Sequence, residues 1–60
     1  MSYYLQAGDQ IYAKQDGDAT FSLVTDYALA TKYETRGAAF EAAVDASFLL
    51  GWMFRVEEGT

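Results

Sequence analysis

The chain has 60 residues, of which 52% are apolar and 17% aromatic, and nine acidic against four basic residues give a net charge of −5. Such a composition predicts a folded chain, and this length leaves room for one small core. The absence of cysteine and histidine excludes disulfides, zinc sites made of those residues, thiol nucleophiles and imidazole bases. The negative net charge is unfavourable for binding the phosphate backbone of a nucleic acid, so we expect no direct nucleic-acid binding.

The first fifteen residues predict a β-hairpin, because apolar and polar side chains alternate on both sides of a turn at Gly8-Asp9-Gln10. A three-residue loop places Ala7 opposite Ile11 and collects the apolar side chains on one face, whereas a two-residue loop would separate them. Positive φ at Gly8 or Asp9 would close this turn.

A break at residues 16–18 ends the second strand, and residues 20–24 predict a short third strand. Thr25 or Asp26 can cap a brief helical turn, because a side-chain oxygen there accepts hydrogen bonds from free amides. We expect residues 32–34 to be extended or to form a short connection.

The main helix is predicted from Arg36 to Leu50, with Thr35 as its N-terminal cap and Gly51 ending it in the left-handed conformation. The most apolar run, residues 37–54, is interrupted by Glu41, Asp45 and Ser47, so no stretch reaches the roughly 18 uncharged apolar residues of a membrane span.

A closing strand is predicted over residues 52–57, with Trp52, Phe54 and Val56 on the core face and residues 58–60 as a frayed tail. We therefore expect all 60 residues to form a single small α+β domain. Its sheet is mostly antiparallel, with three or four strands and one main helix across it, in the order β-β-β-(short helix)-α-β.

The predicted helix has more apolar surface than packing on one sheet requires. The sector that we expect to face the sheet consists of Phe40, Ala43, Val44, Ser47, Phe48 and Leu50. A second apolar stripe consists of Ala38, Ala39, Ala42, Ala46 and Leu49. Only Glu41 and Asp45 are plainly polar, which leaves a narrow acidic strip.

The alanine stripe has two explanations. Alanine is the best helix former and is common on exposed helix faces. Alternatively, alanines four residues apart permit close approach of a second helix, and a domain of this size without disulfides or metals gains stability by association. We favour a homodimer through the second stripe.

The chain has, in order, a hairpin, an F-x-L-x-x-D-x-x-x-A-x-x-Y-x-T run, an alanine-rich helix and a closing strand. This pattern resembles small uncharacterised accessory proteins of phages and prophages. The matching residues are Phe21, Leu23, Asp26, Ala30, Tyr33, Thr35, Ala38, Ala39, Phe40 and Gly51. The resemblance covers most of the chain and brings no catalytic residues with it. It implies a setting in which small acidic proteins bind and disable host factors.

One acidic segment has partial calcium-loop spacing. Asp16, Asp18 and Thr20 match the first three ligand positions, but Phe21 and Tyr27 stand where the loop needs a glycine and a bidentate acid. We interpret the segment as a turn, and we expect the chain to hold no metal and no cofactor.

Other polar and aromatic groups have a structural and a functional interpretation. Glu41 and Asp45 lie one helical turn apart, but without an imidazole they suit a solvated strip or a basic partner better than acid–base catalysis. Tyr4 and Tyr12 lie on the hairpin face away from the core, where they either cover the sheet or anchor an interface.

We expect a non-enzymatic phage-type protein that binds and inhibits a host protein, such as a nucleic-acid-handling or defence enzyme, at a basic site. The expected contact residues are Tyr4, Asp9, Tyr12, Asp16, Asp18, Glu41, Asp45, Glu57 and Glu58. The alternative is a self-associating structural or adaptor subunit whose acids only maintain solubility. Without a signal peptide or membrane span, we expect a cytoplasmic protein with no membrane partner, in the host cytoplasm if it is phage-encoded.

Overall fold

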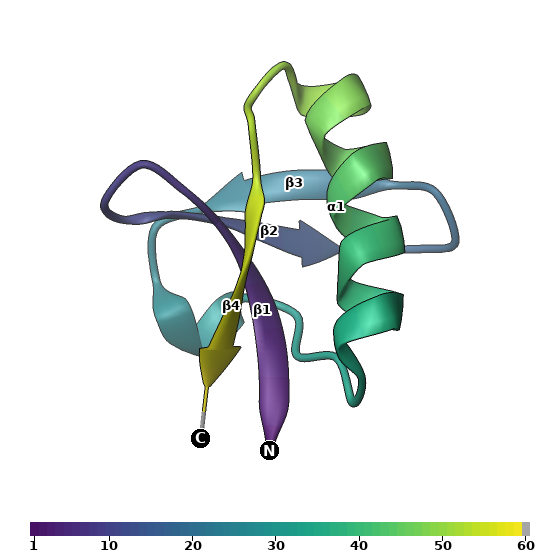
Figure 1. Ribbon diagram of the computed structural model, residues 1–60. Coiled ribbons are helices and arrows are strands. Elements are labelled where there is room, and N and C mark those ends of the chain that lie inside the picture. Colours follow the sequence, from purple (N-terminus) through teal and green to yellow (C-terminus); the bar gives the residue numbers. More distant parts are fainter. Residues whose placement is uncertain (60) are drawn as a thin grey trace.

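The computed structural model describes residues 1–59 and contains one four-stranded antiparallel sheet and one long helix (Figure 1). The elements are β1 (Ser2–Ala7), β2 (Ile11–Gln15), β3 (Phe21–Val24), the short 3-10 helix η1 (Tyr27–Leu29), α1 (Arg36–Leu50) and β4 (Arg55–Gly59). The strands lie side by side in the order β3-β2-β1-β4. The predicted α+β fold and its order of elements are confirmed.

The first hairpin has the predicted three-residue loop, with Ala7 paired to Ile11 and Gly8 at a φ of 67°. β1 and β2 pair at only one further position, Gln6 with Tyr12, and then diverge. The sheet therefore consists of two ribbons, β1–β4 and β2–β3, which cross one another in Figure 1.

The segment after η1 connects the diverging strands. Tyr33 exchanges two backbone hydrogen bonds with Tyr3 of β1, at 2.8 and 2.9 Å. On the β2 side, the Thr31 amide donates to the Ala13 carbonyl at 3.3 Å, and the Thr31 hydroxyl accepts from the Gln15 amide at 2.7 Å. The Tyr33 hydroxyl also donates to the Gln15 side chain at 2.7 Å, and burial raises the pKa of this phenol.

Both helices have the predicted caps. The Asp26 side chain caps η1, and the Thr35 hydroxyl accepts from the Ala38 amide at 3.1 Å at the start of α1. Gly51 ends α1 at a φ of 75°, with its amide donating to the Ser47 carbonyl. These boundaries follow from local side-chain chemistry, which explains why they can be found in the sequence.

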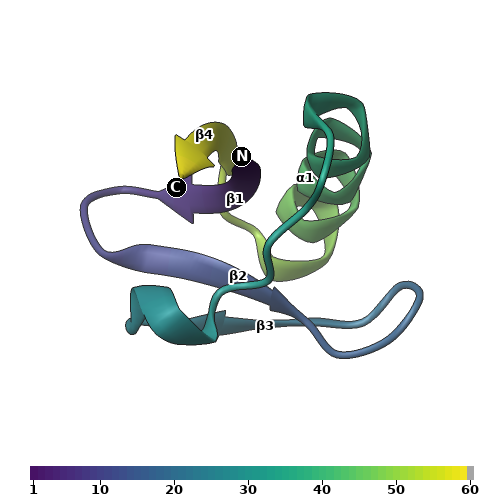
Figure 2. The ribbon, with the colours of Figure 1, turned by 90° about the horizontal axis from the view of Figure 1, so that it is seen from below.

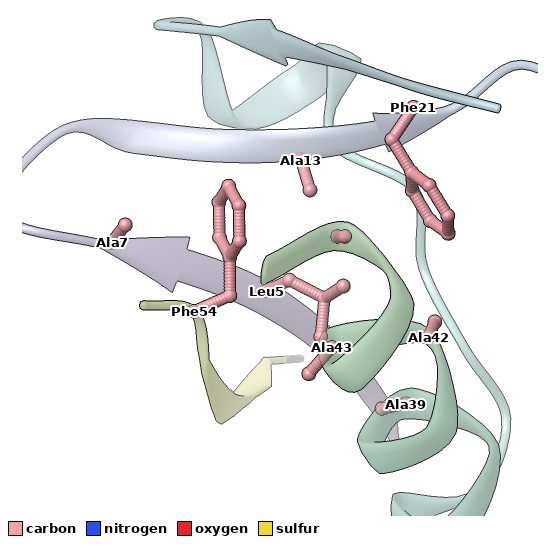
Figure 3. Packing of buried hydrophobic residues seen from close by; sticks show 9 residues of the cluster. Leu5, Ala7, Ala13, Phe21, Ala39, Ala42, Ala43 and Phe54 are labelled. Atoms are coloured by element: carbon pink, nitrogen blue, oxygen red, sulfur yellow. The ribbon is translucent and has the colours of Figure 1, made fainter. Parts of the chain in front are cut away.

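Alanines form the face of α1 that packs on the sheet. Ala39 and Ala46 are completely buried, and Ala42 and Ala43 are nearly so. Figure 3 shows Ala39, Ala42 and Ala43 against side chains from both ribbons. The helix lies in the angle between the two ribbons (Figure 2). The core cluster consists of Leu5, Ala7, Ala13, Phe21, Ala39, Ala42, Ala43, Ala46 and Phe54.

The orientation of α1 differs from the prediction. Phe40, Val44 and Phe48, which were expected to face the sheet, have exposed fractions of 62%, 54% and 87%. The strands and the segment before β4 already fill the space beneath the helix with bulky groups such as Leu5 and Phe54. Small side chains on α1 then complete the packing, because a close-packed core does not accept large groups from both sides.

The predicted self-association stripe is wrong for the same reason. Ala39, Ala42 and Ala46 are buried against the sheet and cannot meet a second copy of the folded chain. Ala38 and Leu49 are exposed, but they lie at the two ends of the stripe, and the three alanines between them are buried. Ala39, Ala42 and Ala46 therefore stabilise the domain as core residues.

The closing strand is also displaced from its predicted position. β4 begins at Arg55, not at Trp52, and Glu58 and Gly59 pair with β1 instead of fraying. The third residue of the predicted tail, Thr60, lies outside the described residues.

The turn after α1 accounts for this shift. The Ser47 hydroxyl accepts a 3.0 Å hydrogen bond from the Phe54 amide, and the Phe54 ring enters the core. Trp52, predicted as a core residue, stays 42% exposed, and Met53 beside it is almost fully exposed.

Enlarging one buried alanine tests this packing. Because Ala39 has no free surface, we expect Ala39→Leu to lower the free energy of unfolding by about 1–3 kcal/mol. Ala38→Leu, at the neighbouring exposed position, is the matched control and should change it by less than about 0.5 kcal/mol. Urea unfolding followed by circular dichroism measures both, and equally small effects would contradict the orientation of α1.

Candidate protein-binding surface

Large apolar side chains form a continuous line on the outward face of α1. Phe40, Val44 and Phe48 occur at intervals of four residues, which places them on successive turns of one helix face. We call these three residues the apolar ridge. Contiguous exposed apolar surface on a soluble domain commonly marks an interaction site.

The apolar surface continues beyond the ridge at the C-terminal end of the helix. Leu49, Trp52 and Met53 are all substantially exposed. Leu49 still belongs to α1, and the turn at Gly51 directs Trp52 and Met53 to the surface before Phe54 enters the core.

Two hollows border the apolar ridge. An open groove of about 590 Å³ lies between α1 and β4. Its lining combines apolar side chains with the polar residues Arg36, Ser47 and Arg55, and the apolar ones are Phe40, Ala43, Val44, Phe54 and Val56. A second hollow of about 360 Å³ lies between α1 and the loop that joins β2 to β3, and its lining consists of Ala19, Val44, Asp45, Phe48 and Leu49. Val44 lines both, so the ridge separates them.

One carboxylate lines the second hollow, and two others occur close to its lining residues in the sequence. Asp45 lines it directly, Glu41 lies one helical turn earlier, and Asp18 immediately precedes Ala19 in the facing loop. All three are exposed, and none of them forms an ion pair among residues 1–59.

The four basic residues interact with other groups. Lys14 and Arg55 form ion pairs with carboxylates two residues further along the chain, at 3.7 and 2.7 Å. Lys32 donates to two backbone carbonyls near η1 at 2.8 Å each, and the Arg36 guanidinium lies 5.2 Å from the ring centre of Tyr3. The negative charge beside the second hollow is therefore not neutralised by these side chains.

The predicted tyrosine contacts lie on the sheet face away from α1. Tyr4 and Tyr12 form a cluster with Tyr27 of η1, with ring centres 4.9 to 5.9 Å apart. Glu57 stands opposite Tyr4 in the β1–β4 pair. Desolvation raises the pKa of Tyr4, and the negative charge of Glu57 raises it further.

The nine predicted contact residues do not form one surface. Of the nine, Asp45 alone lines the hollow beside α1; Glu41 lies one helical turn earlier, and Asp16 and Asp18 belong to the loop whose Ala19 lines the other side. The tyrosine face holds Tyr4, Tyr12 and Glu57, and Glu58 lies in the edge strand β4. Asp9 belongs to the β1–β2 loop, which projects away from α1 (Figure 1).

Sequence reasoning missed the apolar ridge because it assigned large residues to the core. A usable signal was present, since Ala39, Ala42, Ala43 and Ala46 follow the i, i+3, i+4, i+7 spacing of a buried helix face. With alanines at those positions, the larger residues must occupy the outward face.

Residues 1–59 contain no group of three or more acidic side chains placed to hold a metal ion. Within the same residues, no helix is both long and apolar enough to cross a bilayer. Comparison with protein-family models, curated proteins and solved structures finds no match for this chain.

The tyrosine face yields a pH-dependent prediction. The folded state holds the Tyr4 pKa above its ordinary value of 10.0, so the neutral phenol stabilises the fold below pH 10. This contribution is lost as the pH rises through the folded-state pKa. We expect Glu57→Gln to lower the Tyr4 pKa, measured by NMR titration of labelled tyrosine rings. Glu58→Gln is the matched control, and equal effects of both variants would contradict the placement of Glu57.

Proposed function

We propose that this chain is a non-enzymatic acidic protein that binds another protein and blocks the surface that it covers. The observation that carries the proposal is the apolar ridge, whose three large side chains remain in water while alanines fill the core. Contact with a partner would bury this surface, and apolar burial is the main favourable term in most protein association.

The surroundings of the ridge favour a protein as the partner. Glu41 and Asp45 run beside it and would repel a phosphate backbone, whereas a protein can offer apolar and basic groups together. Both hollows are open to solvent, which suits side chains of a partner better than an enclosed small molecule.

In this proposal the partner is a host protein with a basic site, such as an enzyme that handles nucleic acid, and the chain acts in the host cytoplasm. The resemblance to phage accessory proteins and the net charge of −5 support this setting. The acidic flank would steer the chain to such a site, and the apolar ridge would hold it there.

The second candidate is a self-associating subunit, because the same apolar ridge could be covered by a second copy. Antiparallel pairing of two ridges would place Glu41 and Asp45 of one copy beside those of the other. Like charges at such an interface are unfavourable, so we rank this candidate below a basic partner.

Site-specific photo-crosslinking tests the proposal. A benzophenone side chain replaces Phe48, or Gln10 in the distant β1–β2 loop as the matched control, in cells that naturally contain the protein. We expect one discrete adduct from position 48 and none from position 10. Phe48→Ser should then weaken binding to the purified partner about tenfold or more, while Gln10→Ser leaves it unchanged.

The adduct also separates the two candidates. A heterologous protein supports the proposed function, whereas a covalent dimer of this chain overturns it in favour of self-association. No adduct at position 48, or equal adducts at both positions, would contradict the ridge as the binding surface.

A further inference from the structure

The hollow between α1 and the β2–β3 loop indicates the chemistry of the partner. We propose that this hollow receives an arginine side chain of the bound protein, an inference that rests on the proposed function. Four of its lining residues are apolar, namely Ala19, Val44, Phe48 and Leu49, and Asp45 is the one charged group among them.

The lining matches the two parts of a long basic side chain. Such a side chain has an apolar stem that packs on apolar surface and a charged end that stays hydrated or ion-paired. Val44 and Leu49 can contact the stem, and the carboxylate of Asp45 can meet the charged end.

Charge around the hollow favours a cation. Asp45 has no ion-pair partner in the part of the chain that the structure describes, and Glu41 and Asp18 add negative charge nearby. A partner cation would therefore form its pair without displacing an existing one, and partial burial at the interface would strengthen that pair.

Arginine fits this hollow better than lysine. Asp45 and Phe48 are three residues apart on α1, so the carboxylate and the highly exposed ring are neighbours. A planar guanidinium can stack on an aromatic ring while it donates two hydrogen bonds to a carboxylate, and an ammonium group has no such geometry.

A second copy of this chain is a poor source of that arginine. Arg36 already lies over the Tyr3 ring. Arg55 is paired with Glu57 and also donates to the Gly8 carbonyl at 2.9 Å. Both would have to leave their present contacts, so the hollow favours a different protein.

NMR titration of the full chain with N-acetyl-arginine amide tests the inference. The neutral isostere N-acetyl-citrulline amide is the ligand control, since it keeps the shape and removes the charge. We expect arginine amide to shift the amide signals of the five lining residues, with a dissociation constant at least about fivefold lower than that of the citrulline amide. Asp45→Asn should remove this difference, whereas Glu34→Gln, at an exposed carboxylate outside the hollow, should keep it.

Equal binding of the two amides, or an unchanged preference in Asp45→Asn, would overturn the assignment of the hollow. Such a result would not decide the proposed function, because the photo-crosslinking experiment tests that function separately. If position 48 still captures a different protein, only the arginine inference fails. If no adduct forms there, the proposed function itself fails.

Discussion

The close contact between the alanine face of α1 and the two crossed ribbons determines most of this structure. Ala39 and Ala46 have no exposed surface, and they lie in one cluster with Leu5 and Phe54. Larger groups at these alanine positions would push the helix away from both ribbons, because protein cores are packed without spare volume. The extended segment 31–33 holds the ribbons at their present separation through hydrogen bonds to β1 and β2.

The same contact explains why α1 presents so much apolar surface to water. With alanines turned inward, Phe40, Val44 and Phe48 must lie on the outward side of a helix that has few polar residues. Glu41 and Asp45 share that side, which places carboxylates without an ion pair among residues 1–59 next to large apolar groups. A surface with this combination suits a partner that contributes both apolar and basic side chains.

Features fixed by neighbouring residues could be predicted from the sequence. The Thr35 cap, the Gly51 terminus and the three-residue hairpin loop all depend on chemistry within a few positions. The rotation of α1 depends instead on the volume that distant strands leave beneath it, and hydrophobicity alone does not encode that volume. Trp52 shows a similar limit, since the turn that buries Phe54 in its place includes a hydrogen bond from the Phe54 amide to the Ser47 hydroxyl, seven residues earlier.

The orientation of α1 can be measured directly because the chain has no cysteine, so a single introduced thiol is the only one present. The measurement compares the labelling rates of Ala46→Cys and Phe48→Cys with a thiol reagent, with the fold of each variant checked by circular dichroism. The buried position should react only when the chain opens, whereas the thiol at position 48 should react nearly as fast as in an unfolded peptide. Fast labelling at position 46 together with protection at position 48 would show that the helix faces the sheet with its large side chains, which would contradict this account.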